Sequence, residues 1–157
     1  MTKTEAAYIA GLIDGEGSLR IFLANQKRPN GDMYTVAHVR LHVGMTDRPI
    51  IEWLHSITGN GSIEIRTQPK HPNWKTCYVV RWSSGTATPL LKTIMPYLRL
   101  KKRHAEIAIE WFRLSKRGRK FVGGRGHTDR TLPYDIVERR AELLAEMKLL
   151  NRKGTLV

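Results

Sequence analysis

The sequence has little cysteine and no long apolar stretch, and both absences narrow the classes of protein that it can specify. Cys77 is the only cysteine in 157 residues, so an intrachain disulfide framework is excluded, and no Cys and His spacing is typical of a zinc site. No apolar run reaches about 18 residues, and no signal-peptide pattern follows Met1. We therefore expect an intracellular protein with no membrane segment.

Acidic residues are also scarce. The chain has 27 Lys and Arg residues against 14 Asp and Glu residues, which gives a formal net charge of +13. Such an excess favours a polyanionic partner, nucleic acid before a membrane surface, although ribosomal and other basic proteins share it. The length suits one domain with a moderate core, so we treat residues 1–157 as a single domain.

One segment near the N-terminus, residues 8–17 (YIAGLIDGEG), predicts a helix of unusual character. It is apolar nearly all round, so we expect it to be buried on more than one side. Thr4 can cap its start, and one of the two following glycines can end it. The helix finishes in two acids, Asp14 and Glu16, where its dipole disfavours negative charge. We therefore expect a cation to be bound near these two carboxylates.

Residues 9–17 resemble the LAGLIDADG motif of homing endonucleases, with Ile9 replacing the first Leu, Gly15 the second Ala and Glu16 the second Asp. The alternative is an ordinary buried helix followed by a glycine-rich turn with two solvated acids. The sequence has no second copy of the motif. One-motif members of this family are typically homodimers whose motif helices pack together. The resemblance therefore implies a homodimer, with these residues at its interface: Tyr8, Ala10, Gly11, Leu12 and Asp14.

Apolar and polar residues alternate in four later segments, which predicts four strands over residues 18–24, 34–45, 62–68 and 75–82. In the third segment Ile63 is expected to point inward, as is Ile65. The dipeptide Asn30-Gly31 favours a hairpin between the first two strands. Each of the four strands then has an apolar side and a polar, largely basic side.

Helices are predicted between and after these strands. Asp47 can cap one that ends at Gly59, and a second opens at Ser84 or Gly85 and stops at Pro96. A joint over residues 97–103 leads into a long amphipathic helix. The basic, glycine-rich segment 116–130 predicts a mobile loop, and a last helix runs from Pro133 to about Asn151.

This order of elements is the αββαββα core of the family that the motif resembles. The resemblance covers about residues 4–115, and it implies an α+β protein with a four-stranded antiparallel DNA-binding sheet. The C-terminal basic loop and helix, residues 116–157, add to that core and match no further motif. The implied partner is double-stranded DNA.

The polar side of the sheet supplies candidate contacts to DNA. A two-stranded ribbon fits the major groove, where Arg pairs with guanine, Gln with adenine and Glu with cytosine. The alternative is the solvated side of any one-sided sheet. The candidates on and near the strands are Arg20, Gln26, Arg28, His38, Arg40, His42, Glu64, Arg66, Gln68, Lys75 and Arg81, and those for phosphate contacts in the basic loop are Arg119 and Lys120.

The reaction that the resemblance implies is metal-dependent hydrolysis of phosphodiester bonds in both DNA strands, at a long near-palindromic target. Glu16 occupies the family's metal-binding acid position, and the Gly15 carbonyl is the usual neighbouring ligand. Mg²⁺ suits these oxygen ligands, and Mn²⁺ should replace it. Asp14 is a further candidate ligand, although we favour for it a role in capping or bracing the interface helices.

Two basic residues are candidates for charge stabilisation around the scissile phosphate. Lys101 matches the lysine that follows the family's Pro-x-Leu-x-Leu run, and its alternative is a solvated lysine in the first turn of a helix. After the second strand the chain departs from the usual Gln-Lys-Asp pattern and has Met45-Thr46-Asp47. Arg48 can supply the missing basic group there.

Three functions remain open from the sequence. The first is a site-specific endonuclease encoded within an intron or intein, which we favour. The second is an RNA maturase that binds its intron RNA, or a catalytically silent nucleic-acid-binding protein of the same fold; the presence of both Asp14 and Glu16 speaks against loss of activity. The third is a structural binder associated with the ribosome or chromatin.

Overall fold

The structure, a computed structural model, describes residues 1–157 apart from 28, 32, 68, 71–72, 123–131 and 153–157, and only the backbone of 117–122. The elements are α1 (Lys3–Glu16), β1 (Gly17–Lys27), β2 (Met33–Met45), α2 (Arg48–Thr58), β3 (Ser62–Arg66), β4 (Cys77–Ser83), α3 (Ser84–Ile94), the 3-10 helix η1 (Met95–Tyr97), α4 (Lys102–Val122) and α5 (Tyr134–Leu150). The predicted order and the α+β class are confirmed.

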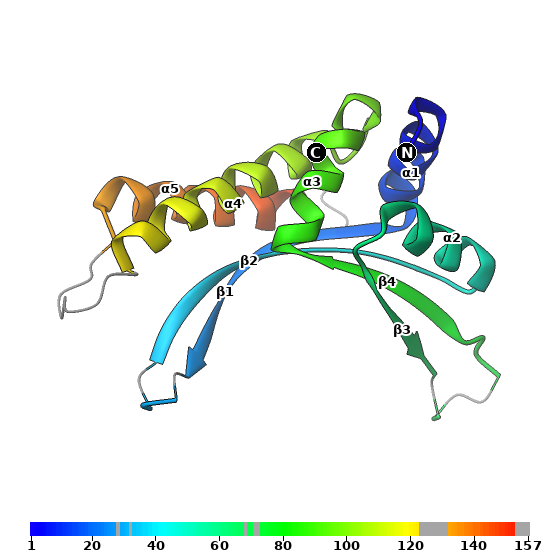
Figure 1. The fold of residues 1–157 in the computed structure, drawn as a ribbon, viewed down its shortest axis with the longest axis horizontal. Helices are drawn as coiled ribbons and strands as arrows, with labels where there is room; N and C mark the ends of the chain where they lie inside the picture. Colours follow the sequence, from blue (N-terminus) through cyan, green and yellow to red (C-terminus); the bar gives the residue numbers. More distant parts are fainter. Residues whose placement is uncertain (28, 32, 68, 71–72, 123–131, 153–157) are drawn as a thin grey trace.

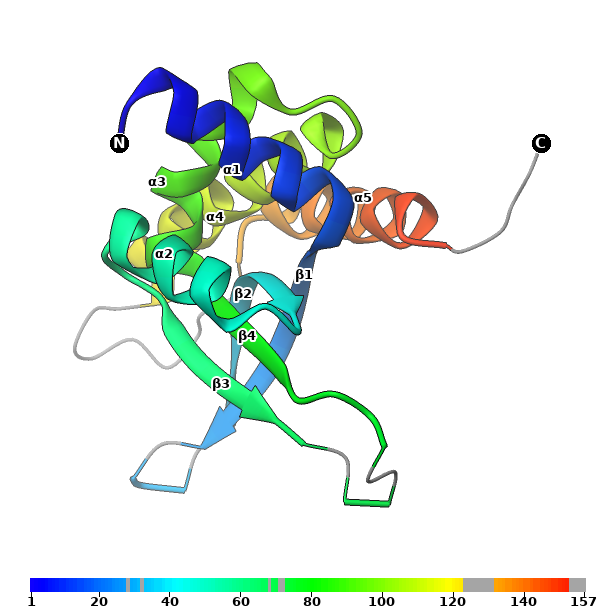
Figure 2. The same ribbon diagram turned by 90° about the vertical axis from the view of Figure 1, so that its right-hand side faces the viewer.

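The strands form one antiparallel sheet in the order β1-β2-β4-β3. β1 pairs along its whole length with β2, from Gly17 opposite Val43 to Lys27 opposite Met33. The sheet arches, with the helices on its outer, convex side (Figure 1). Figure 2 shows that the far ends of all four strands extend beyond the helical layer. We call the side of the sheet that points away from the helices the open face.

The apolar side of the alternating pattern forms the core. Leu19, Leu41 and Trp82 are neighbours across three strands, and each is at most 1% exposed. The indole N–H of Trp82 donates to Thr58 Oγ1 at 3.1 Å, which ties the sheet to the end of α2. Trp111 of α4 is also fully buried in this cluster. Burial of each such side chain stabilises the fold by roughly 1.5–3 kcal/mol.

α1 begins two residues earlier than the sequence predicted. Thr2 rather than Thr4 is its N-cap, because Thr2 Oγ1 accepts from the Glu5 backbone N–H at 3.2 Å while the Glu5 carboxylate accepts from the Thr2 N–H at 2.6 Å. This reciprocal pair is a capping box. The predicted end of the helix is confirmed, since Gly17 is the C-cap and its N–H donates to the Ile13 carbonyl.

Burial at the β3 side of the sheet differs from the sequence expectation. Ile63 and Ile65 lie on the same side of the sheet as the core, yet they are 41% and 60% exposed. The reason is that β3 is a short edge strand that the helices do not fully cover. Val79 lies on the same side of β4 as Arg81, which alternation makes the polar side, yet it is only 1% exposed and packs beside Gly44.

The segment after residue 115 extends α4 and adds the helix α5, which packs on the core. α4 runs to Val122, so residues 116–122 are helical where a loop was predicted, and the rest of that predicted loop, residues 123–130, lies outside the described residues. Leu143 of α5 joins the core, and Arg139 Nε donates to Glu110 of α4 at 2.8 Å. α4 is the longest helix, at 21 residues; within the described part of the chain, neither it nor any other helix has the length and hydropathy to span a membrane.

Gly61, which joins α2 to β3, has no room for a side chain. A Cβ atom there would lie 2.9 Å from Val80 Cγ2 and 3.1 Å from the Trp82 indole nitrogen. We expect Gly61→Ala to lower the free energy of unfolding by about 1–3 kcal/mol in urea denaturation, because core side chains must move. Gly85→Ala is the control, since a Cβ there meets nothing within 4 Å. Equal stability of the two variants would contradict this packing argument.

Candidate active site and nucleic-acid interface

The last turn of α1 delivers the two acids of the motif to one end of the sheet. Glu16 is the final residue of the helix, and Gly17 then starts β1 opposite Val43, close to the C-terminal end of β2. Gly15 and Glu16 are both exposed, whereas Asp14 is half-buried. Carboxylates at a helix C-terminus lie at the negative end of its dipole and need compensation. The structure provides that compensation for Asp14.

Asp14 binds the turn that precedes α4. Its Oδ2 accepts from the Arg99 backbone N–H at 2.7 Å, and its Oδ1 accepts from the Lys101 backbone N–H at 2.8 Å. Burial raises the pKa of Asp14, but these two donors, the Leu100 N–H and the Lys101 charge together outweigh burial and hold the pKa below its usual value. Asp14 therefore braces α1 against the start of α4, and metal binding by Asp14 stays a prediction.

Lys101 reaches the same end of α1 from a distant part of the sequence. Its Nζ donates to the backbone carbonyl of Asp14, 87 residues away along the chain. Its own carbonyl accepts from the Ala105 N–H at 3.0 Å, in the first turn of α4. The predicted catalytic lysine therefore lies next to the Gly15–Glu16 pair, where its ammonium group offsets the negative helix end.

Glu16 and the Gly15 carbonyl provide a small set of hard oxygen donors. The carbonyls of the last helical turn lack partners within the helix, so the Gly15 oxygen is suited to accept a cation. Across the described residues no group of three His, Cys, Asp or Glu side chains could hold a metal ion. The donor set thus fits an ion such as Mg²⁺, which keeps water ligands and uses phosphate oxygens to complete its shell.

Arg48, the third predicted catalytic residue, lies on the first turn of α2. Its Nε donates to Glu52 at 2.7 Å, and its guanidinium carbon lies 5.8 Å from the centre of the Tyr78 ring. The hydrogen bond to Glu52 raises the pKa of Arg48 further above its usual value. These contacts give Arg48 a structural partner, and its part in catalysis stays a prediction.

The open face of the sheet carries the predicted DNA contacts in ordered rows. His42 of β2 lies opposite Arg81 of β4, and the adjacent row pairs Arg20 of β1 with Arg40 of β2. Burial lowers the pKa of His42, and the positive charges of Arg66 and these three arginines lower it further. The imidazole is therefore neutral at pH 7, in a region of strongly positive potential.

Glu64 is the acidic member of this surface. It accepts from Arg66 Nε at 2.9 Å within β3, and it also accepts a hydrogen bond from Arg81 Nη2 of β4. The hydrogen bond from Arg66 is the main cause that lowers the pKa of Glu64. The three predicted DNA contacts therefore form one charged group that holds both guanidinium groups in fixed positions.

The remaining predicted contacts lie toward the ends of the strands. Gln26 accepts a hydrogen bond from the Tyr34 hydroxyl at 2.7 Å near the tip of the β1–β2 hairpin, and Lys75 is exposed just before β4. Arg28, Gln68 and the side chains of Arg119 and Lys120 lie outside the described residues.

Phe22 also lies on this surface, although the sequence prediction of DNA contacts did not include it. Its ring stacks with the His38 ring, with centroids 5.2 Å apart and planes 20° apart. The guanidinium carbon of Arg40 lies 4.8 Å from the centre of the Phe22 ring. Alternation over residues 18–24 puts Phe22 on the polar side of its strand with Arg20, but the predicted contacts comprised only polar and charged side chains. Its apolar character among charged neighbours was the available signal.

The predicted dimer contacts divide between two sides of α1. The exposed stripe of α1 consists of Ala7, Tyr8, Gly11 and Gly15. Ala10 is fully buried in the chain's own core, so it does not reach this stripe, and Leu12 is half-buried against the same core. Tyr8 contacts Trp53 of α2 edge-on, with ring centroids 5.4 Å apart. A Cβ built on Gly11 or Gly15 meets nothing within 4 Å, so the stripe is open.

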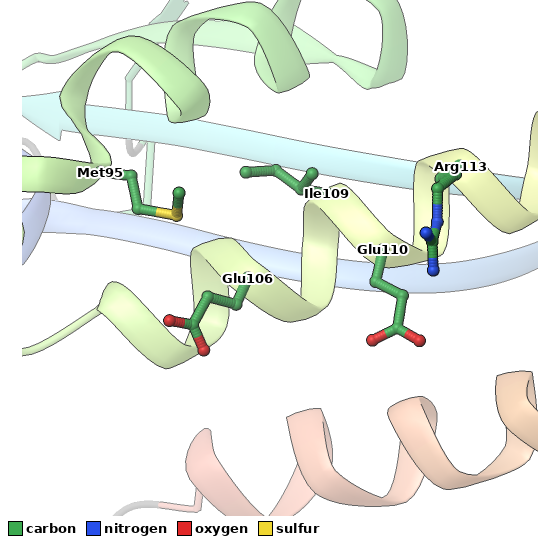
Figure 3. Close-up of a pocket in the computed structure, with 5 residues that line it drawn as sticks. All are labelled: Met95, Glu106, Ile109, Glu110 and Arg113. Atoms are coloured by element: carbon green, nitrogen blue, oxygen red, sulfur yellow. The ribbon is translucent and has the colours of Figure 1, made fainter.

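A cavity of about 300 Å³ elsewhere on the surface contains no predicted site residue. Met95, Ile109 and three charged side chains of α4 line it, and Figure 3 shows Glu106 and Glu110 pointing from α4 toward α5. Both acids have basic partners, Arg103 for Glu106 and Arg139 for Glu110. This cavity belongs to the packing of α4 against its neighbours rather than to the site at the end of α1.

The bonds of Asp14 predict a pH-dependent contribution to stability. We expect Asp14→Asn to lower the free energy of unfolding by about 1.5–3 kcal/mol at pH 7, because hydrogen bonds to a charged group are lost. Since the folded-state pKa of Asp14 lies below its unfolded value, this contribution is complete above that value, about 4, and is lost as the pH falls through the folded pKa. Urea denaturation from pH 3 to 7 checks it, and a difference between the two proteins that is unchanged across this range would contradict it.

The chain was compared with protein families, with curated proteins and with solved structures. No protein-family model matches the sequence, and no curated protein matches it. Solved structures do match. The homing endonuclease I-CvuI in complex with DNA aligns with a TM-score of 0.69 and 16% identity, over 99% of this chain and 87% of that one. The archaeal intron-encoded homing endonuclease I-Vdi141I, also bound to DNA, aligns with a TM-score of 0.59 and 18% identity, over 96% and 86%.

A longer protein matches over part of its length. The I-LtrWI LAGLIDADG homing endonuclease bound to target DNA aligns with a TM-score of 0.65 and 15% identity, over 94% of this chain but 45% of that one. The present chain therefore spans about half of I-LtrWI and most of I-CvuI. With its αββαββα order, its single arched sheet and its motif helix, the chain has the fold of the LAGLIDADG homing endonucleases.

Proposed function

We propose that this protein is a site-specific homing endonuclease that hydrolyses both strands of a long, near-palindromic DNA target, depends on a divalent metal and acts as a homodimer. The observation that carries the proposal is that Lys101 Nζ donates to the Asp14 carbonyl, next in the chain to Gly15 and Glu16, at the end of α1 from which β1 of the basic sheet begins. The candidate catalytic residues therefore lie at one end of the sheet whose open face carries the candidate DNA contacts.

Three features support DNA as the substrate. The open face presents one arginine on each strand, Arg20, Arg40, Arg66 and Arg81, and guanidinium groups of this kind can pair with guanine in the major groove. The net charge of +13 favours a polyanion. The neighbours I-CvuI, I-Vdi141I and I-LtrWI are DNA complexes of the same fold.

The exposed oxygens at the end of α1 support a metal-dependent reaction. Glu16 and the Gly15 carbonyl would hold Mg²⁺, or Mn²⁺ in its place, and a bound ion there stabilises the attacking and leaving oxygens of a phosphodiester. Lys101 places its ammonium group beside them, where it offsets charge that develops on the scissile phosphate. The I-CvuI complexes contain DNA in the presence of Mg or Ca.

The exposed stripe of α1 supports assembly of two chains. Glycines at positions 11 and 15 leave a smooth surface on which a second helix can approach closely. Because I-LtrWI is about twice as long for the same fold, two copies of this chain would form an enzyme of comparable size. Each copy would contribute one Glu16, one for each DNA strand.

Substitution of Glu16 tests the proposed catalysis. We expect Glu16→Gln to reduce cleavage at least about 100-fold while DNA affinity changes less than about threefold, because the carboxylate acts on the reaction rather than on the fold. The substrate is a duplex that joins the gene's flanking sequences, with Mg²⁺ or a chelator, and the products are resolved on a sequencing gel. Glu138→Gln, at an exposed position of α5, is the matched control.

The outcomes of this experiment separate the alternatives. Metal-dependent double-strand breaks at one position, absent in Glu16→Gln, would support the proposal. Normal cleavage by Glu16→Gln would refute the catalytic role of that residue. Tight binding by the unaltered protein, with no breaks in Mg²⁺ or Mn²⁺, would favour a silent binder or a maturase instead.

Substitution of Gly11 tests the homodimer. We expect Gly11→Leu to give the mass of one 18.0 kDa chain in sedimentation velocity where the unaltered protein gives two, because the leucine blocks close approach of a second α1. The single chain should still fold, since Leu favours helix and a Cβ at Gly11 meets nothing within 4 Å. Gly85→Leu, at another open glycine, should remain dimeric. A Gly11→Leu protein that stays dimeric would exclude this interface.

A further inference from the structure

The open face of the β1–β2 ribbon changes character along its length. Next to the end of α1 its rows are charged or polar, as in the pair Arg20–Arg40. Farther out, Phe22 lies opposite His38 and Ala24 lies opposite Val36. At the tip the surface is polar again. The ribbon thus carries an apolar band, which we define as Phe22, Ala24 and Val36, in the middle of a basic surface.

The residues of this band are not part of the hydrophobic core. The apolar residues that build the core from β1, Leu19 and Ile21, point to the other side of the sheet and are at most 6% exposed. The members of the band are half-buried on the side that faces away from the helices. Contact with His38 and Arg40 holds the Phe22 ring in place, so the ring is fixed before any ligand binds.

The major groove of DNA offers one kind of apolar group. Base edges there present hydrogen-bond donors and acceptors, except for the C5 methyl group of thymine, which apolar side chains contact. We propose that the apolar band recognises thymine methyl groups in each half of the DNA target, with Phe22 as the main contact. This inference rests on the proposed function, because it assumes that the open face binds DNA.

The position of Phe22 along β1 indicates where these thymines lie. Phe22 follows Glu16 by six residues. At about 3.3 Å per strand residue this is about 20 Å, and at about 3.4 Å per base pair it corresponds to about six base pairs. The thymines should therefore lie about six base pairs from the bond that each chain cleaves, outward from the base pairs that Arg20 and Arg40 contact.

The test removes the methyl group from the DNA and leaves the protein unchanged. Binding sites are first selected from randomised duplexes with the unaltered protein in chelator, and each thymine of the selected site is then replaced singly by deoxyuridine. We expect binding to weaken about fourfold at one or two thymines per half-site, in line with the loss of one buried methyl group, and to change little elsewhere.

Two protein variants identify the residue that makes the contact. In Phe22→Ala the deoxyuridine penalty at those thymines should disappear, even if overall affinity falls because His38 and Arg40 lose their packing partner. Phe22→Leu should keep the penalty. Met33→Ala is the matched control, because Met33 is an exposed apolar residue of the same ribbon on the opposite side of the sheet. It should also keep the penalty.

The outcomes distinguish failure of this inference from failure of the proposed function. A selected site at which no deoxyuridine weakens binding would overturn the inference and leave DNA binding intact. A penalty that persists in Phe22→Ala would assign the methyl contact to another residue and would also overturn it. Failure to select any site would count against the proposed function itself. Tighter binding of a site with a 5-methylcytosine–guanine pair at that position than of one with a cytosine–guanine pair would support contact with the methyl group rather than with the rest of the base.

Discussion

The hydrogen bonds between the Asp14 carboxylate and the turn before α4 are the interaction on which the site depends. They join the C-terminal end of one helix to the start of another, two ends whose dipoles have opposite signs. A carboxylate that would be destabilised by its own helix is therefore stabilised by N–H groups of the turn that leads into the next helix. The same turn fixes Lys101, so one contact sets the position of both the motif helix and its lysine.

The arrangement around α1 follows from that bond. One side of the helix is committed to the core through Ile9, Ala10 and Ile13, which leaves the small residues of the other side exposed. Because Asp14 is occupied within the chain, Glu16 is the acid that remains available at the helix end. A helix of fourteen residues thus contributes to the core, to the proposed dimer contact and to the proposed metal site.

Local patterns in the sequence predicted most of the fold and part of the site. Period-two alternation identified the four strands and the side on which Arg40 and Phe22 lie, because that pattern is a direct consequence of strand geometry. The exposure of Ile65 could not be predicted, since it depends on strand order and on how far the helices reach across the sheet. Residues 116–122 are helical despite Gly118, whose helix cost of about 1 kcal/mol is offset within a longer helix. The partners of Asp14 lie 85 and 87 residues away, beyond any local pattern.

The charge distribution of the open face is unfavourable for an isolated protein and favourable for one that binds a polyanion. Arg20 and Arg40 lie directly opposite each other, an arrangement that destabilises a sheet, and Glu64 is the one acid in the four strands. The lowered pKa of His42 keeps that ring neutral and so limits the repulsion in the free chain. When phosphates approach, the repulsion among the arginines is relieved and counterions are released. The sheet therefore gives up some stability in the free state, and this strain would favour the proposed DNA-bound state.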